Sequence, residues 1–551
     1  MKYSKRYVAF TLIMVMALLL KFNTFGEDYS KIGDFRGGEL ESDHWSPLVA
    51  ADVNDSLLTA LIDNKTYTNE KYPIYMADDR SIMVPVDMLR DALNCSAHLY
   101  SPTELVVEKR NLSVTLRPVE KDGVYYVDVK DLSLLMEYNY SFDISNKTII
   151  ATDSSDSTSV VPARYDLREK QRVSTIRNQG NYGTCWAFAA TSALESTLLP
   201  EQKTMFSVDH MTMSNSFLAN QYDGGEYTMG MAYLAAWQGP VYEEQDPYGD
   251  GETNSELEAV RHVQEMQIIE GKNYEAIKTA VLKYGGVQTS LYSTLTSATG
   301  GSGYYNPEHS AYCYIGTEKP NHDVVIIGWD DNYSKNNFSV ELEGDGAFIC
   351  QNSWGDGFGE NGVFYVSYYD SNIGTHNIVY TRIDDADNYD KIYQSDLCGW
   401  VGQMGYNQES IFGANVFTAE EDERLRAAGF YVTGPQTKYR VYIVNRFENE
   451  SSFDHMVEVA QGTIGQAGYY TIDFDNPVEV SSGERYAVVV YLETPGAIRP
   501  LAVEFDSGDY RLSTVDLDDG EGYISYNGAK FVDVKTKKDC NICIKAYTDR
   551  K

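Results

Sequence analysis

The middle of the chain combines one clear helical pattern with several runs typical of buried strands. Residues 187–195 contain no Gly or Pro and follow a Gly-rich polar loop, which predicts a helix that begins close to Cys185. Farther along, the apolar runs 324–329 and 347–350 predict buried strands. These patterns indicate an α+β domain, which we place at residues 161–383.

Weaker patterns precede this domain. A strand–helix–strand pattern occurs twice from residue 81 onward, with short helices expected around 89–93 and 132–136. We therefore expect a small α+β repeat module at residues 81–152. A polar segment at residues 27–80 precedes it, and a flexible Ser- and Asp-rich linker at 153–160 follows it.

The C-terminal region has a pattern of apolar and polar residues that differs from the rest of the chain. After the acidic run at 384–387, short alternating runs such as 439–444 and 486–491 are separated by turn residues. This pattern predicts a β-sandwich over residues 384–551.

The first residues indicate export. A basic start is followed by an apolar run at residues 7–20, and such a run is shorter than the ~20 residues that span a bilayer. We expect a signal peptide at residues 1–26, a secreted or cell-surface protein, and no membrane span after its removal. An uncleaved anchor remains the alternative, because no small-x-small cleavage triplet follows.

The composition limits the classes of partner and cofactor that we expect. With 45 basic and 81 acidic residues the net charge is −36, which disfavours binding to nucleic acid or to anionic membranes. Seven cysteines are few for an exported chain of 551 residues. The Cys540–Cys543 CxxC lacks a second ligand pair, so we interpret it as structural, either a disulfide or two free thiols. We expect no metal and no cofactor.

Three separated residues could share one reaction. At a helix N-terminus the dipole favours a thiolate, although a lone Cys185 before an apolar helix is more often a small core residue. His322 opens a buried strand, where a histidine is commonly structural, and Asn352 follows another strand. Together they predict a nucleophile, a base and a residue that orients the base. Gln179 could share the developing oxyanion with the Cys185 N–H group.

The segments around these residues resemble the papain family of cysteine peptidases. Residues 178–186 (NQGNYGTCW) are similar to its nucleophile motif, residues 321–329 to its histidine strand, and residues 352–355 to its NSWG motif. The resemblance implies a two-lobed fold with a helical lobe and a β-barrel-like lobe. It makes Gln179, Cys185, His322 and Asn352 the catalytic residues. It makes Gly224, Gly225, Asn321 and Trp354 the substrate-side residues, with the paired glycines binding an extended peptide.

Two departures from this family affect the cleft and its control. Two family cysteines that bridge each other are Tyr182 and Tyr222 here, which predicts a cleft wall that is packed and not disulfide-bonded. Residues 27–160 show no counterpart of the family's helical inhibitory propeptide.

The flanking regions carry resemblances of their own. The repeat module resembles the stalk-like domain at the N-terminus of copper amine oxidases. The C-terminal region resembles the lectin-like domain of bacterial secreted peptidases, through segments such as 388–393 and 414–417. That resemblance implies a carbohydrate or cell-surface ligand, although its aromatic residues are more often core residues.

The preferred hypothesis is hydrolysis of peptide or protein substrates through an acyl-enzyme thioester. Two alternatives remain open: a catalytically silent surface-binding protein on the same scaffold, and a transpeptidase that transfers the acyl group to an amine.

Overall fold

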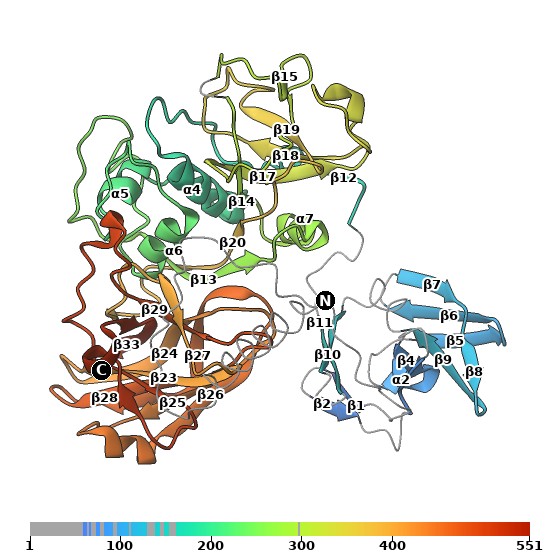
Figure 1. Ribbon diagram of the computed structural model, residues 1–551. Helices are drawn as coiled ribbons and strands as arrows, with labels where there is room; N and C mark the ends of the chain where they lie inside the picture. The colour runs from blue at the N-terminus through green and yellow to red at the C-terminus, as the bar shows by residue number, and fades with distance from the viewer. Residues whose placement is uncertain are drawn as a thin grey trace, which may run out of the picture.

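The computed structural model describes residues 161–295 and 298–551 and several shorter segments nearer the N-terminus (Figure 1). These segments are 59–62, 65–67, 73–77, 82–91, 96–109, 112–128, 138–143 and 148–153. The α+β fold class expected from the sequence is confirmed, because a region of helices and strands is followed by a region made mostly of strands.

The helical lobe is built around one buried helix. Its helices are α4 (Cys185–Leu198), α5 (Val208–Met213) and α6 (Tyr227–Ala235). Every residue of α4 from Trp186 to Ser196 is buried, because the helix is apolar and small-residue-rich on all sides. It packs against α5 and α6 and against the strands of the second lobe. The predicted helix therefore begins at Cys185 itself.

The second lobe is a mainly antiparallel sheet that carries the histidine strand. Its strands are β12 (Arg164–Asp166), β14 (Val287–Leu291), β15 (Tyr305–Asn306), β16 (Ala311–Tyr312), β17 (His322–Asp330), β18 (Ala347–Gln351), β19 (Val363–Ser367) and β20 (Asn377–Asp385). The order β19-β18-β17-β14-β20 places β17 in the interior of the sheet, and all but its last residue are buried. Helix α7 (Tyr274–Lys283), capped by the Asn273 side chain, contacts β14 and β17.

This sheet continues into the C-terminal domain. Strand β13 (Arg261–Ile269) pairs on one side with β20 and on the other with β27 (Ala467–Val480), so that Glu265 lies opposite Tyr470. Beyond β27 the sheet adds β24 (Glu423–Val432), β33 (Ile544–Arg550) and β21 (Lys391–Tyr393), giving 13 strands in all. Trp400, Tyr431 and Tyr469 join the apolar core formed by residues of the preceding domain. Residues on the two sides of the boundary expected at residue 383 therefore share a sheet and a core.

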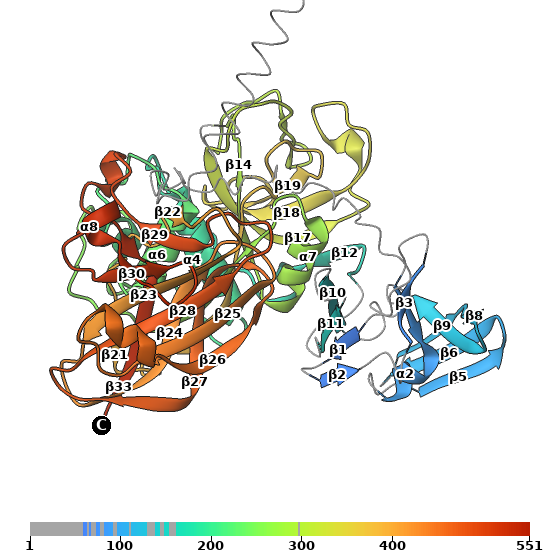
Figure 2. The same cartoon turned by 60° about the horizontal axis from the view of Figure 1, so that its bottom comes forward.

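A second sheet completes the predicted β-sandwich (Figure 2). It consists of β26 (Val457–Ile464), β25 (Thr437–Val444), β28 (Arg485–Glu493), β23 (Ser410–Thr418), β30 (Gly522–Ser525) and β31 (Val532–Asp533). Alternate residues such as Val441 and Val490 are buried in the core between the sheets. Smaller elements are β22 (Gly402–Met404), β29 (Leu501–Glu504), β32 (Asn541–Ile542) and α8 (Lys535–Lys538).

The N-terminal segments form three small sheets. The elements are β1 (Thr59–Ile62), β2 (Lys65–Tyr67), β3 (Tyr75–Met76), β4 (Ile82–Pro85), α2 (Val86–Asp91), β5 (Ser96–Ser101), β6 (Glu104–Lys109), β7 (Leu112–Leu116), β8 (Val119–Lys121), β9 (Val124–Asp128), β10 (Tyr138–Asp143) and β11 (Thr148–Asp153). The boundary expected at residue 81 is wrong, because β1 pairs with β11 and β3 with β4. The polar composition of residues 27–80 suggested a separate segment, but strands β1 and β3 within it pair with strands that follow residue 81. The second expected helix, at 132–136, lies outside the described residues, as do the expected signal peptide and residues 154–160 of the expected linker, whose first residue, Asp153, ends β11.

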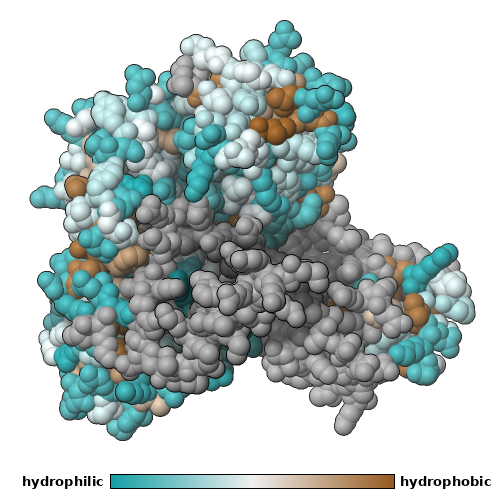
Figure 3. Space-filling view, in the orientation of Figure 1, coloured by the Kyte–Doolittle hydropathy of each residue, from teal (hydrophilic) through white to brown (hydrophobic). Residues whose placement is uncertain are grey.

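The described surface is mainly hydrophilic on the face shown in Figure 3, with apolar patches between teal and pale areas. This agrees with the acidic composition. Among the described helices, none has the length and apolar character needed to cross a bilayer.

Candidate active site

Cys185 is the first residue of α4, at the end of the Gly-rich loop. The loop is held in place by Gly183, whose N–H donates to the Gln221 carbonyl at 2.7 Å. Thr184 then starts the helix by accepting from the Ala187 N–H at 3.1 Å. Cys185 is partly exposed, whereas the other described cysteines are buried. The thiol therefore lies at an accessible helix N-terminus.

His322 is the first residue of β17, and its ring is fixed from two directions. Its Nε2 lies 2.8 Å from the Asn352 Oδ1 atom, and its ring stacks on Trp354 with the centroids 4.9 Å apart. Because the amide oxygen can only accept, Nε2 carries the hydrogen and Nδ1 remains the basic nitrogen. Asn352 is itself held by its N–H, which donates to the Gly362 carbonyl at 2.9 Å.

Gln179 is joined to the Asn352 turn by a short antiparallel contact. The Gln179 N–H donates to the Ser353 carbonyl at 2.8 Å, and the Gly355 N–H donates to the Arg177 carbonyl at 2.9 Å. The Ser353 hydroxyl donates to the Gln179 Oε1 atom at 2.7 Å. The amide nitrogen of Gln179 faces the Gly-rich loop, where it donates to the Tyr182 carbonyl at 2.8 Å, and because a carbonyl only accepts, this bond fixes the orientation of the amide. The bond of Ser353 with Gln179 was not recognised from the sequence, although Ser353 is the Ser of the NSWG segment.

Burial favours the neutral forms of Cys185 and His322. Burial and the Asp323 carboxylate raise the pKa of the Cys185 thiol to about 12, against N–H groups near the sulfur that lower it. Burial lowers the pKa of His322 to about 4, partly offset by its bond with Asn352. We expect the two groups to ionise as a pair, because the charges of a thiolate and an imidazolium offset each other.

Asp323 is a buried carboxylate beside this pair that the sequence analysis did not single out. It accepts from the Ser290 hydroxyl at 2.7 Å and from the Gln288 amide at 3.0 Å. Burial raises the pKa of Asp323 to about 6, against these two bonds, which lower it. Only its position directly after His322 could have marked it in the sequence.

We predict that Asp323→Asn makes the Cys185 thiol ionise at lower pH. A nearby negative charge disfavours the thiolate, so its removal should lower the midpoint of the pH–alkylation curve by about one unit. Below pH 6, where Asp323 is largely protonated in the native protein, the two rates should converge. Iodoacetamide labelling of Cys185 as a function of pH measures this. The control is Asp330→Asn, at the other end of β17, and an unchanged or higher midpoint in Asp323→Asn contradicts the prediction.

Tyr182 and Tyr222, which occupy the positions of the two bridged cysteines of the papain family, pack against each other. The rings of Tyr182 and Tyr222 lie 5.0 Å apart, and Tyr248 packs against Tyr182 at 6.2 Å. The Tyr248 hydroxyl also donates to the Gln179 carbonyl at 2.9 Å. The cleft wall is therefore packed, as the paired loss of cysteines predicted.

Gly224 and Gly225 lie against the Gly-rich loop that precedes Cys185. Gly224 has a φ of +75°, and its backbone N would lie 2.8 Å from a Cβ atom added to Gly183. A Cβ on Gly225 would come within 2.3 Å of the Trp186 indole nitrogen. Trp186 is buried, so this approach needs a residue without a side chain.

We predict that Gly225→Ala destabilises the catalytic domain by about 1–3 kcal/mol through overpacking against Trp186. Thermal unfolding of the full chain should show a lower Tm. Gly301→Ala is the matched control, because an added Cβ there meets nothing within 4 Å. Equal Tm values for the two variants would contradict this account of the glycine.

Asn321 lies beside His322 but is bound to a neighbouring strand end. Its Oδ1 accepts from the Ser293 N–H at 2.7 Å, and its Nδ2 donates to the Ser293 carbonyl at 3.1 Å. These contacts fix the start of β17. The expected contact of Asn321 with substrate stays a prediction.

Cys540 and Cys543 are free thiols, which decides between the two structural alternatives for the CxxC. Cys543 donates to the Gly399 carbonyl at 3.2 Å. In the part of the chain that the structure describes, no group of three or more His, Cys, Asp or Glu side chains could hold a metal ion.

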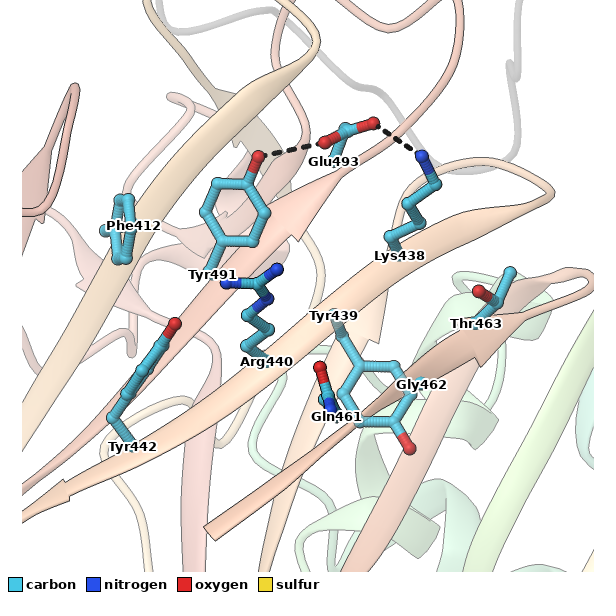
Figure 4. Close-up of a pocket in the computed structure, with 10 residues that line it drawn as sticks. All are labelled: Phe412, Lys438, Tyr439, Arg440, Tyr442, Gln461, Gly462, Thr463, Tyr491 and Glu493. Atoms are coloured by element: carbon cyan, nitrogen blue, oxygen red, sulfur yellow. Dashed lines mark hydrogen bonds and ion pairs between the residues drawn. The ribbon is translucent and has the colours of Figure 1, made fainter. Parts of the chain in front are cut away.

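The C-terminal domain carries a separate hollow of about 620 Å³ (Figure 4). One row of its lining crosses four strands, with Phe412 opposite Tyr491, Tyr491 opposite Arg440, and Arg440 opposite Gln461. The Glu493 carboxylate beside this row binds Lys438 at 3.1 Å. These side chains alternate with buried residues, so the hollow lies on the sheet face opposite the sandwich core.

Comparison with known proteins agrees with both domains. Residues 161–382 match the model of the papain family cysteine protease, and residues 392–548 match the lectin like domain. The structure of the clostridial cysteine protease Cwp84 after propeptide cleavage is similar at a TM-score of 0.64 and 27% identity, over 70% of this chain and 99% of that one. The protease and lectin-like domains of Cwp84, a surface layer associated protein of Clostridium difficile, give 0.63 and 27%, over 71% and 89%.

Curated relatives match the protease part. A cysteine protease of Blomia tropicalis is 25% identical over 285 residues, which are 47% of this chain and 79% of that protein. Mouse pro-cathepsin H is 28% identical over 216 residues, which are 38% of this chain and 61% of that protein. Residues 161–382 are therefore a papain-family cysteine protease domain, and the chain continues into a lectin-like domain at residues 392–548.

Proposed function

We propose that this protein is an exported peptidase that hydrolyses peptide bonds with Cys185 as nucleophile, His322 as base and Asn352 as the residue that orients the base. The single observation that carries the proposal is the His322–Asn352 hydrogen bond of 2.8 Å beneath the Trp354 ring. This bond leaves Nδ1 of the imidazole as the nitrogen that can take a proton from a thiol.

The reaction has two halves. The Cys185 sulfur attacks the substrate carbonyl while its proton passes to His322, and the imidazolium then gives that proton to the leaving amine as the C–N bond breaks. Water, deprotonated by His322, attacks the resulting thioester, and the thiol leaves with the proton. No net oxidation or reduction occurs.

Gln179 is proposed to stabilise the tetrahedral intermediate together with the Cys185 N–H. Its amide nitrogen has two hydrogens, and the bond with the Tyr182 carbonyl uses one. The second can face a substrate oxygen. The Tyr182 carbonyl only accepts, so it keeps the amide nitrogen on this side, while the Ser353 hydroxyl binds the amide oxygen.

Turnover of a fluorogenic peptide library tests hydrolysis and separates it from both alternatives. The full chain, under reducing conditions, should cleave peptides and lose this activity after treatment with an epoxysuccinyl thiol inhibitor. No turnover would favour a silent binding protein. Adducts with an added amine, at the expense of free acid, would favour a transpeptidase.

Export is proposed from the apolar run at residues 7–20. N-terminal sequencing of protein recovered from the medium of expressing cells should give a start near residue 27. Retention in the membrane fraction with residues 1–26 attached would favour the uncleaved anchor.

We propose that the hollow on the lectin-like domain binds a carbohydrate of the cell surface. Rings of Phe412, Tyr442 and Tyr491 offer flat apolar faces, and Arg440 and Gln461 offer donors for hydroxyl or acidic groups. Binding to purified cell-wall polysaccharide should weaken about tenfold or more in Arg440→Ala and Tyr491→Ala. Arg446→Ala, which removes an exposed arginine of the same domain, is the control. Unchanged binding in the first two variants would reject the site.

A further inference from the structure

A segment of the lectin-like domain is bound to the loop that leads to the paired glycines (Figure 1). The segment contains the 3-10 helix η5 (Tyr510–Leu512). The Leu218 N–H donates to the Arg511 carbonyl at 2.8 Å, and the Thr514 hydroxyl donates to the Ser216 carbonyl at 2.7 Å. These bonds fix η5 against residues 216–218, which belong to the helical lobe.

The same segment also lies beside both flanks of the paired glycines. On one side the Arg511 guanidinium lies 3.3 Å from the carboxylate of Glu226, the residue that follows Gly225. On the other side Tyr510 lies near Asp223, the residue directly before Gly224. Arg511 is oriented by Asp509 at 2.8 Å. One short stretch of a different domain therefore borders the strip of backbone that is proposed to bind the substrate.

Large side chains are left exposed at this contact. Tyr510 is 56% exposed, Leu218 53% and Tyr222 72%, although all three belong to segments that are firmly hydrogen-bonded. Tyr222 precedes Asp223, and Leu218 is bonded to the residue after Tyr510. Large exposed apolar side chains on neighbouring, hydrogen-bonded segments commonly mark a binding surface.

We propose that Tyr510 of the lectin-like domain, with Leu218 and Tyr222, forms a subsite of the peptidase cleft that selects aromatic or large aliphatic substrate side chains. The proposal rests on the function proposed above. A peptide that pairs with the Gly224–Gly225 backbone is extended, so its side chains project alternately and one set reaches the borders of that strip. The subsite would act on residues two to four positions before the scissile bond.

The subsite has a rigid support, which selectivity requires. Strand β27 of the lectin-like domain is hydrogen-bonded to β13 of the protease domain over four residue pairs, from Glu265–Tyr470 to Ile268–Ala467. Tyr431 and Tyr469 are buried in the shared core. Tyr510 therefore keeps its place beside the glycines without a mobile hinge.

The test compares kcat/KM for matched peptides that carry Phe or Ala at each of the three positions. The native protein should prefer Phe at one of them, and Tyr510→Ala should reduce that Phe-to-Ala ratio about tenfold. Tyr510→Phe keeps the ring and should retain the ratio within about twofold. Tyr526→Ala is the matched control, because Tyr526 is also 56% exposed in the same domain.

Several outcomes overturn the proposal and leave the peptidase assignment intact. An unchanged ratio in Tyr510→Ala, or an equal loss in Tyr510→Phe, would show that the ring does not select the substrate. A similar loss in Tyr526→Ala would also count against it. Absence of turnover in the native protein is a different result, because it would remove the proposed function itself.

Discussion

Replacing Cys185 with alanine is expected to lower kcat/KM for every cleaved peptide by about 10⁴-fold or more, because the reaction then has no nucleophile. The remaining N–H groups and Gln179 could still polarise a carbonyl, so substrate binding should change little. A helix that begins with alanine is well tolerated, and Cys185 is partly exposed, so the fold should survive.

The control for this variant is Cys313→Ala. Cys313 is a free thiol buried in a small apolar cluster with Ala311 and Phe338. Its removal should leave kcat/KM within about threefold, at some cost in stability that thermal unfolding would report. Residual activity above one tenth of the native value in Cys185→Ala would contradict the assigned nucleophile.

Replacing His322 with glutamine is expected to lower kcat/KM by about 10³-fold or more. Glutamine approximates the volume of histidine but cannot accept and return a proton near neutral pH. It also removes the partner that offsets the charge of the thiolate, whose formation burial opposes. Alkylation of Cys185 should therefore slow together with turnover.

Asn352→Ala separates orientation from proton transfer. It removes one hydrogen bond to the imidazole, so the expected loss is about 10- to 100-fold, far smaller than for His322→Gln. The pH dependence should change as well. The bond with Asn352 raises the pKa of His322, and its loss should move the acidic limb of the kcat/KM profile to lower pH. Equal losses in the two variants would contradict the division of roles.

The sequence predicts those features that depend on local pattern. The helix that begins at Cys185 and the buried strand that begins at His322 follow from neighbouring residues, as does the β-sandwich class of the C-terminal part. The positions of the two tyrosines in place of cysteines also indicate a packed wall, and their rings are in contact.

Features that depend on contacts distant in sequence could not be predicted in this way. The Ser353–Gln179 bond joins residues 174 positions apart, and nothing in the sequence around either residue indicates the other as its partner. Strand β13 bears the pattern of an ordinary buried strand, and nothing in it indicates a partner beyond residue 460. The polar composition before residue 81 concealed strands whose partners lie at β4 and β11.

The most direct test of the central claim is to trap the acyl-enzyme. The full chain is mixed with a slowly deacylating ester substrate, quenched in acid within its steady state, digested and analysed by mass spectrometry. We predict an acyl group on the peptide that contains Cys185, absent in Cys185→Ala and strongly reduced in His322→Gln. An acyl group on another residue, or turnover of the ester without any adduct in the native protein, would contradict the account.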